Sequence, residues 1–133
     1  MGAKAKFSEG WCYETLREAR WPNGTICPYC GQGRVTTHTR FTNTPRHRYL
    51  CLDCRRTFSD LTGTPFARTN LPLSTWFFCL QLSGQGLRTS ELARELRVKW
   101  DTLLYMQRRL TLPLNRPGLI RRLREAAQEI QSE

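Results

Sequence analysis

Two short motifs decide the fold of this chain, CPYC at residues 27–30 and CLDC at residues 51–54. Each motif holds two cysteines, and Gly31 after the first supplies the permissive backbone of a tight turn. Four thiolates at this spacing complete the tetrahedral shell that Zn²⁺ takes in structural sites. Such a shell leaves no open position for water, so the single expected zinc ion is structural. The predicted ligands are Cys27, Cys30, Cys51 and Cys54.

The spacing alone leaves two alternative explanations for the four cysteines. One is a pair of disulfides, which form in oxidising compartments, and the other is a rubredoxin-like iron site. Neither use explains the charge of the chain.

The chain is strongly basic, with 21 Lys and Arg against 11 Asp and Glu, a net charge of +10 and a pI near 10. This balance indicates a polyanionic partner. All the basic residues except Lys4, Lys6 and Lys99 are arginine, whose planar fork matches phosphate and the guanine edge. The plainer alternative is a protein that its charge merely keeps in solution.

Nothing in the sequence predicts a membrane segment, because no apolar run is long enough to span a bilayer. Residues 1–7 lack the apolar core of a signal peptide. We therefore expect a cytoplasmic, nucleoid-associated protein, in a reducing compartment that favours zinc over disulfides.

The expected fold class is α+β: a small four-cysteine zinc ribbon, then a helix-turn-helix three-helix unit and a C-terminal amphipathic helix. A helix is predicted over residues 8–20 with Ser8 as its N-cap. Three short antiparallel strands are predicted over residues 34–41, 46–51 and 55–59, with a turn at 42–45. The expected divisions are 8–62 for helix and ribbon, 63–72 for a linker, 73–112 for the helix-turn-helix and 117–131 for the last helix.

The second half of the chain predicts helices over residues 74–82, 89–96 and 100–110. The first is aromatic on one side, and Thr89 is the expected cap of the second. This layout fits a helix-turn-helix, whose second helix enters the major groove. Arg97 occupies the turn position where a left-handed residue is common, at a cost of roughly 1 kcal/mol. A plain bundle of amphipathic helices is the alternative.

Two sets of residues are predicted to contact DNA. If Leu103, Met106 and Leu110 face inward, the outward face of helix 100–110 offers side chains that read bases. The base-reading candidates are Trp100, Asp101, Leu104, Tyr105 and Arg108, with Lys99 and Arg109 flanking on phosphate. The basic strand surface is a candidate phosphate track, formed by Arg34, Arg40, Arg46, Arg48, Arg55 and Arg56. For any one of these arginines the alternative is a solvated sheet face.

A family resemblance is carried by several motifs besides the cysteines. RWPNG at residues 20–24 precedes the first cysteine motif, and YLCLDCRRTFS at residues 49–59 contains the second. GTPFART at residues 63–69 and LARELRV at residues 92–98 follow. Over residues 7–110 the chain resembles the N-terminal zinc ribbon and helix-turn-helix module of insertion-sequence transposases. RYLC at residues 48–51 is also similar to the small DNA-binding repressor and transposition factor of the simplest insertion elements.

The resemblance implies what the chain contains and what it lacks. In such transposases a nuclease-like domain with an acidic metal-binding triad follows this module, whereas this sequence ends at Glu133. We therefore expect no catalytic residues and no enzyme activity. Lys99 and Arg97 stand where the family usually has a capping serine and a turn glycine.

The remaining notable residues have plain structural explanations. Cys12 and Cys79 are expected to be buried thiols, and His38 and His47 to lie on the strand surface without a nucleophile beside them. The apolar stripe of residues 118–130 is expected to pack on its own domain. A homodimer or a partner protein bound through this helix is the alternative.

The sequence therefore predicts a sequence-specific double-stranded DNA-binding protein, a transposase-derived transcription regulator or transposition accessory factor. One alternative is a non-catalytic part or subunit of a transposase that is completed in trans. Another is a zinc-ribbon protein that docks on the transcription machinery.

Overall fold

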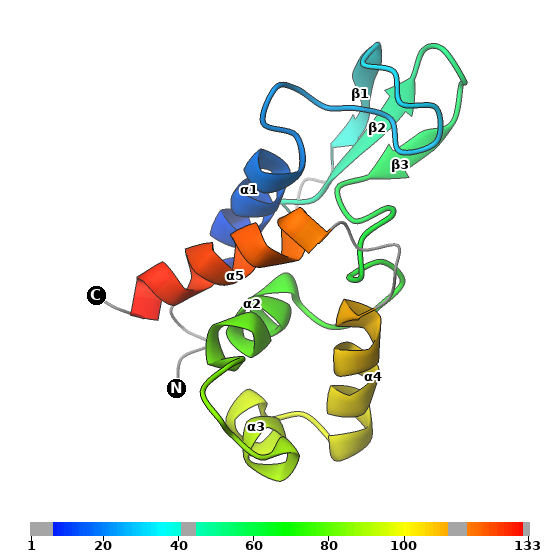
Figure 1. Cartoon of the computed structure of the whole chain (residues 1–133). Coiled ribbons are helices and arrows are strands. Elements are labelled where there is room, and N and C mark those ends of the chain that lie inside the picture. Colours follow the sequence, from blue (N-terminus) through cyan, green and yellow to red (C-terminus); the bar gives the residue numbers. More distant parts are fainter. Residues whose placement is uncertain (1–6, 41–44, 112–116, 132–133) are drawn as a thin grey trace.

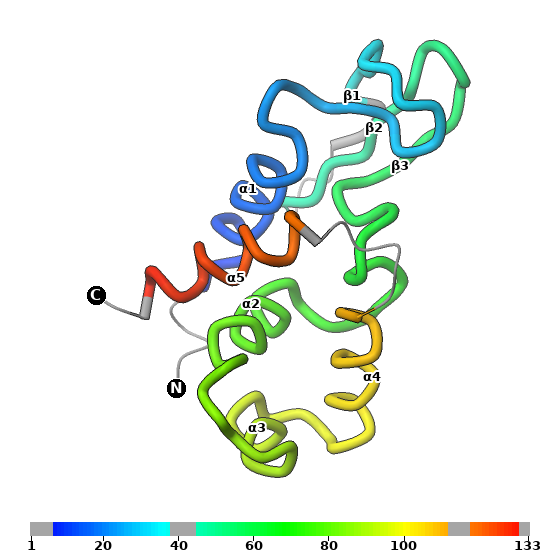
Figure 2. Tube along the Cα trace, viewed as in Figure 1, coloured from blue at the N-terminus to red at the C-terminus, as the bar shows by residue number. Residues whose placement is uncertain are grey.

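The zinc-ribbon half and the helical half lie at opposite ends of the molecule, with helices α1 and α5 between them (Figure 1). The computed structural model describes residues 7–40, 45–111 and 117–131. The element order is α1, three strands and then α2 to α5, as the trace in Figure 2 also shows. The expected α+β class is confirmed. Most of the expected turn at 42–45 lies outside the described residues.

Helix α1 spans Glu9–Arg20 and begins where the sequence predicts. Ser8 is its N-cap, since its hydroxyl accepts a hydrogen bond from the Trp11 N–H at 3.1 Å. Cys12 and Leu16 lie on its buried face. The helix ends before Pro22, which cannot continue it.

The three predicted strands form one antiparallel sheet in the order β1-β2-β3. The strands are β1 Val35–Arg40, β2 His47–Cys51 and β3 Thr57–Ser59. Tyr49 of the central strand pairs with Phe58 of β3. The pairing of β1 with β2 shifts register between Thr37 and Thr39. The sheet carries the second cysteine motif at the end of its central strand.

Helix α2 spans Leu73–Leu82 and is buried nearly all round, not on one aromatic side as expected. Its first backbone N–H groups donate hydrogen bonds to a side chain of α1. The Glu9 carboxylate accepts from the backbone N–H of Leu73 at 3.0 Å and of Ser74 at 2.6 Å. An acid at a helix N-terminus also meets the favourable end of the helix dipole. Helix α1 therefore fixes the start of α2.

The segment at residues 63–72, expected to be a linker, includes residues that are packed into the core. Phe66 is 1% exposed, and its ring meets Trp76 of α2 edge-on at 5.1 Å between centroids. One core contains Phe7 and Leu16 on the N-terminal side of the segment and Trp76 beyond it. The predicted division after residue 62 therefore does not separate two cores, since α1 packs with the later helices.

Helices α3, Thr89–Leu96, and α4, Trp100–Leu110, are joined by a three-residue turn. Arg97 adopts the left-handed conformation that its position suggested, with φ 58°. The Val98 N–H then bonds back to the Ala93 carbonyl at 3.1 Å, which satisfies the end of α3. The expected cap at Thr89 is one residue late, because Arg88 is the N-cap and its N–H donates to Glu91 at 2.9 Å.

Helix α5 spans Pro117–Gln131 and packs on α2 and α1 of its own chain (Figure 1). Leu119, Leu123 and Ala127 of its apolar stripe are buried. Gln81 of α2 donates to the Ala127 carbonyl at 3.1 Å. The expectation that the stripe packs internally is confirmed, and so the stripe is not an exposed surface for a partner. Among the described helices, none has the length and apolar character needed to cross a membrane.

Candidate metal centre and nucleic-acid surface

The four predicted ligands converge on one point at the end of the ribbon. Their sulfur atoms all lie within 4.8 Å of one another. Cys27 and Cys54 approach to 3.7 Å, and Cys30 and Cys51 to 3.5 Å, measured between the Sγ atoms. A tetrahedral ZnS₄ centre with Zn–S bonds of about 2.3 Å places its sulfurs about 3.8 Å apart. The residues present therefore fit one structural zinc ion.

The two cysteine motifs build this centre from matching turns. In each, the residue after the second cysteine has a left-handed backbone, Gly31 with φ 78° and Arg55 with φ 66°. Their N–H groups bond back to the carbonyls of Cys27 and Cys51, both at 2.9 Å. The Cys54 N–H, followed by that of Asp53, lowers the pKa of the Cys51 thiol to about 7. Backbone donors thus favour the thiolate form of Cys51, the form in which cysteine binds zinc.

A small apolar cluster supports the metal centre from inside the ribbon. Tyr49 and Phe58 from neighbouring strands are buried beside Cys27 and Cys51. Trp21, at the end of α1, meets the Tyr49 ring edge-on at 5.7 Å. This core is separate from the helical one, so the zinc ion supplies much of the order of the ribbon.

The sequence profile described as "Transposase zinc-ribbon domain" matches residues 7–57, which contain α1 and all four ligands. Residues 7–57 belong to the transposase zinc-ribbon family. A relative from Halobacterium salinarum, "Uncharacterized protein in transposable element ISH50", is 34% identical over 119 residues. The alignment covers 88% of this chain and 40% of the relative, so the chain spans less than half of that protein. No solved structure matches the chain.

A buried acid that the sequence analysis did not single out joins helix α1 to the sheet. Asp60 is fully buried directly after β3. Its carboxylate accepts from the Tyr49 hydroxyl at 2.6 Å, the His47 N–H at 2.8 Å and Arg17 Nε at 3.3 Å. Burial, and then the bond to Asp60, raise the pKa of the Tyr49 phenol, so the hydroxyl keeps its proton.

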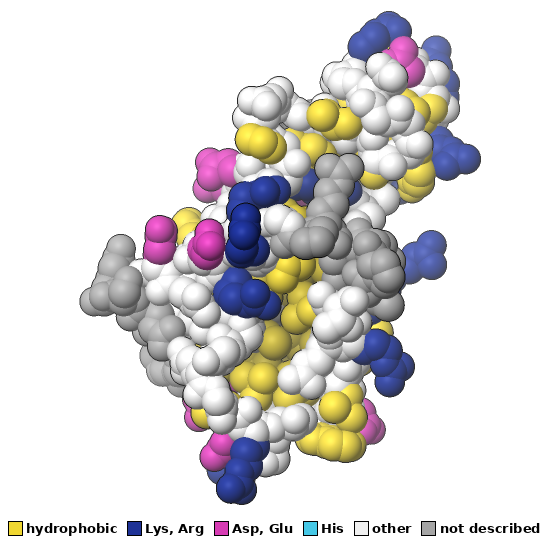
Figure 3. Space-filling view, in the orientation of Figure 1, with side chains coloured by type: hydrophobic (Ala, Val, Ile, Leu, Met, Phe, Trp, Pro, Cys, Tyr) yellow, Lys and Arg dark blue, Asp and Glu magenta, His cyan; other side chains and the backbone are white. Residues whose placement is uncertain are grey.

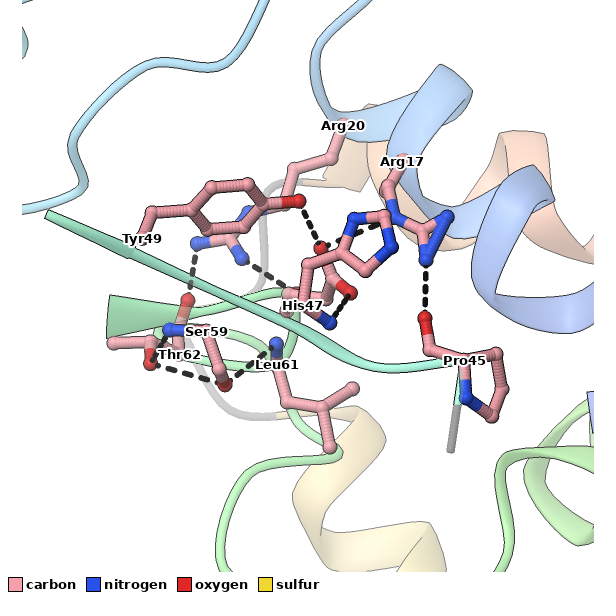
Figure 4. A network of polar contacts seen from close by, with 9 residues as sticks. Arg17, Arg20, Pro45, His47, Tyr49, Ser59, Leu61 and Thr62 are labelled. Carbon is pink, nitrogen blue, oxygen red and sulfur yellow. Dashed lines mark hydrogen bonds and ion pairs between the residues drawn. The ribbon is translucent and has the colours of Figure 1, made fainter. Parts of the chain in front are cut away.

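Two arginines of α1 complete this junction, as Figure 4 shows. Arg17 also donates to the Pro45 carbonyl, and Arg20 donates to the carbonyls of Asp60, at 2.7 Å, and Thr62. Arg17 and Arg20, which lie one turn apart on α1, thus bind the helix to the sheet and to the segment that follows the sheet. A signal was present in the sequence, because Asp60 is one of only two acids in residues 34–68, although its partner Arg17 lies outside that segment. The other acid, Asp53, pairs with Arg34.

The outward face of α4 is as predicted. Leu103 and Met106 are buried, and Leu110 is partly buried. The base-reading candidates Trp100, Asp101, Tyr105 and Arg108 are exposed, as is Lys99 before the helix, whereas the candidate Leu104 is partly buried. Trp100 is 54% exposed and Tyr105 39%, which is unusual for large aromatic rings.

Arg109 is not placed as expected. Its guanidinium turns away from that face and donates to the carbonyls of Pro65 at 3.0 Å, Thr64 at 3.4 Å and Ala67 at 3.5 Å. Arg109 therefore fastens α4 to the packed segment, a role that amphipathic spacing cannot reveal because its partners are backbone carbonyls.

The predicted strand arginines whose side chains the structure describes divide into three groups. Arg48, Arg55 and Arg56 are exposed, and Arg56 lies over the Tyr29 ring at 4.8 Å. Arg34 is exposed but pairs with Asp53 at 2.8 Å. Arg46 is partly buried. The side chain of Arg40 lies outside the described part, so its expected contact stays a prediction. Lys and Arg side chains recur along the edge of the molecule from the ribbon to α4 (Figure 3).

The other notable residues behave largely as expected. Cys12 and Cys79 are buried thiols in the helical core. His47 is partly exposed on β2, with its ring near Tyr49. The side chain of His38 lies outside the described part.

Proposed function

We propose that this chain binds double-stranded DNA in a sequence-specific manner, as a transposase-derived transcription regulator or transposition accessory factor of the cytoplasm and nucleoid. The observation that carries the proposal is the exposed face of α4. Trp100, Tyr105 and Arg108 lie on a helix that follows a second helix through a tight turn, as in helix-turn-helix proteins. The transposase family of the ribbon supports the same partner.

Different surfaces have different tasks in this proposal. The α4 face reads base edges in the major groove, because a helix fits that groove and Arg pairs with guanine in two-point geometry. The exposed ribbon arginines bind phosphate, which positions the protein without reading sequence. The zinc ion holds the ribbon that carries them.

The protein acts on DNA without cutting it. Four thiolates close the zinc shell, so the metal offers no position for an activated water. Purified protein supplied with magnesium or manganese leaves supercoiled plasmid intact and joins no strands. Metal-dependent nicking that one carboxylate substitution abolishes contradicts this part of the proposal.

A second candidate function is favoured by one comparison. The chain aligns with 40% of a longer protein from a transposable element, so it also suits the recognition part of a transposase completed in trans. This candidate requires a separate chain with an acidic triad. Mixing the two chains then yields strand transfer that neither yields alone.

The experiment that tests the proposed function is selection of bound duplexes from a random pool. An enriched motif establishes sequence reading, and its symmetry reports how many copies bind. Retention of duplexes without enrichment shows phosphate binding alone. Absence of binding favours a ribbon that docks on the transcription machinery instead.

A further inference from the structure

A pocket of about 440 Å³ opens between the zinc ribbon and the segment that precedes α2. Tyr29 of the first cysteine motif forms part of its wall, and the packed segment and Arg109 of α4 form others. Its volume falls in the range of about 300–1,000 Å³ that is usual for small-molecule sites. Because its walls include Tyr29 and Arg109, the pocket lies between the ribbon, whose arginines are proposed to bind phosphate, and α4, which is proposed to read bases.

Three arginines line this pocket: Arg46, Arg68 and Arg109. The described residues around it include no Asp or Glu. Arg109 donates to the backbone carbonyls of Pro65, Thr64 and Ala67, which hold its guanidinium at the pocket wall. A concave surface with one sign of charge focuses its field and attracts an anion.

Arg68 is the arginine best placed to bind a ligand. It is exposed, and within the described part of the chain it makes no hydrogen bond or ion pair. Its backbone has φ 60°, a conformation that costs a residue with a side chain more than it costs glycine. Such strain is found at sites where a side chain must be presented in one direction.

We propose that this pocket binds one phosphate of the DNA backbone, with the Arg68 guanidinium as its hydrogen-bonding fork. Arg46 and Arg109 contribute positive charge from the pocket walls. The assignment rests on the proposed function and adds a position to it. A phosphate held here lies between the ribbon arginines and α4, so it fixes the depth and angle at which α4 enters the groove.

The first test compares two variants that each remove one positive charge. Arg68→Gly removes the guanidinium. Glycine adopts the left-handed backbone of this position without strain, so the variant is expected to fold. Arg121→Ala on α5 is the matched control, because Arg121 is exposed and does not line the pocket. Zinc content and circular dichroism confirm that both variants are folded. Affinity is then measured at several salt concentrations on the selected duplex and a scrambled one.

Arg68→Gly is expected to reduce the slope of log K against log salt by about 0.9, the value for one lost phosphate contact. The loss is equal on both duplexes, while Arg121→Ala leaves the slope unchanged. Ethylation of individual phosphates locates the contact: one phosphate that interferes with binding of the unaltered protein ceases to interfere with Arg68→Gly.

Two results overturn the assignment in distinguishable ways. If the unaltered protein binds tightly but Arg68→Gly matches Arg121→Ala in slope and interference pattern, the pocket is wrong and the proposed function stands. If the unaltered protein binds neither duplex, the proposed function fails and the phosphate site fails with it.

Discussion

Arg97 shows how a single backbone angle limits the stability of the α3–α4 connection. Its φ of 58° is the left-handed region, which costs a residue with a Cβ about 1–2 kcal/mol. Arg97→Gly removes this cost but adds freedom to the unfolded chain, at about 0.5–1 kcal/mol. We expect a net gain of about 0.5–1 kcal/mol in the free energy of unfolding by urea denaturation.

The control for this prediction lies in α3, the helix that ends just before Arg97. Arg94 is an exposed residue within α3, so Arg94→Gly is expected to lower the free energy of unfolding by about 1 kcal/mol. Destabilisation by both glycine variants to the same extent shows that Arg97 is not strained.

The two cysteines outside the metal centre are expected to be chemically inert in the folded protein. Burial raises the pKa of the Cys79 thiol to about 11, and burial followed by the nearby Glu9 charge raises that of Cys12. Alkylating reagents attack thiolates, and at pH 8 both groups remain protonated and covered. Mass spectrometry after iodoacetamide treatment is expected to find neither modified. Rapid modification of Cys79 in zinc-loaded protein contradicts its burial.

At the scale of elements, the helices and strands followed from patterns that are local in the sequence. Ser8 and the apolar face of residues 8–20 predict α1, and the paired cysteines predict the ribbon, because the causes lie within a few residues. The segment at 63–72 could not be predicted in the same way. Its Gly and Pro indicate a loop, whereas in the structure its carbonyls accept hydrogen bonds from Arg109, more than forty residues later.

Substitution of an arginine in α4 and of an arginine in the ribbon is expected to change DNA affinity in different ways. Arg108→Ala removes a proposed base contact, so we expect it to cost about 1–3 kcal/mol on the selected duplex and to relax preference at one base pair. Arg48→Ala weakens binding to all duplexes alike and reduces the salt slope by about one. Titrations on selected and scrambled duplexes measure both.

The assignment of the two surfaces is reversed if Arg108→Ala weakens both duplexes equally while Arg48→Ala alters sequence preference. If neither substitution changes affinity, DNA binding itself is contradicted, since both side chains are exposed.

At the scale of the whole molecule, Asp60 is the acid on which the junction between ribbon and helices depends. Asp60→Asn keeps its shape but removes the charge that Arg17 meets. Hydrogen bonds to charged groups contribute about 1.5–3 kcal/mol each, so a loss of this size in unfolding free energy is expected. Zinc content stays at one per chain, because no ligand is touched. Asp53→Asn, which affects only an exposed pair, is the control and is expected to cost less than about 1 kcal/mol.

The described residues form two separate apolar cores, and this arrangement predicts how the molecule responds to loss of zinc. The ribbon core of Tyr49 and Phe58 is small, whereas the helical core around Trp76 includes residues from all five helices. Structural zinc contributes about 10 kcal/mol of apparent folding free energy in small modules. We therefore expect chelation, or Cys51→Ser, to unfold the strands while the helices persist.

Hydrogen exchange read by mass spectrometry distinguishes the two halves. Peptides covering residues 45–59 lose protection when zinc is removed, whereas peptides covering α2 retain it, because their hydrogen bonds and burial do not involve the metal. Cys12→Ala, which leaves the ligands intact, keeps one zinc ion and a protected ribbon. Loss of protection throughout α2 on chelation shows that the Asp60 junction makes the molecule one cooperative unit. Unchanged protection in both halves shows instead that the ribbon does not need the metal, and the structural role of zinc is then wrong.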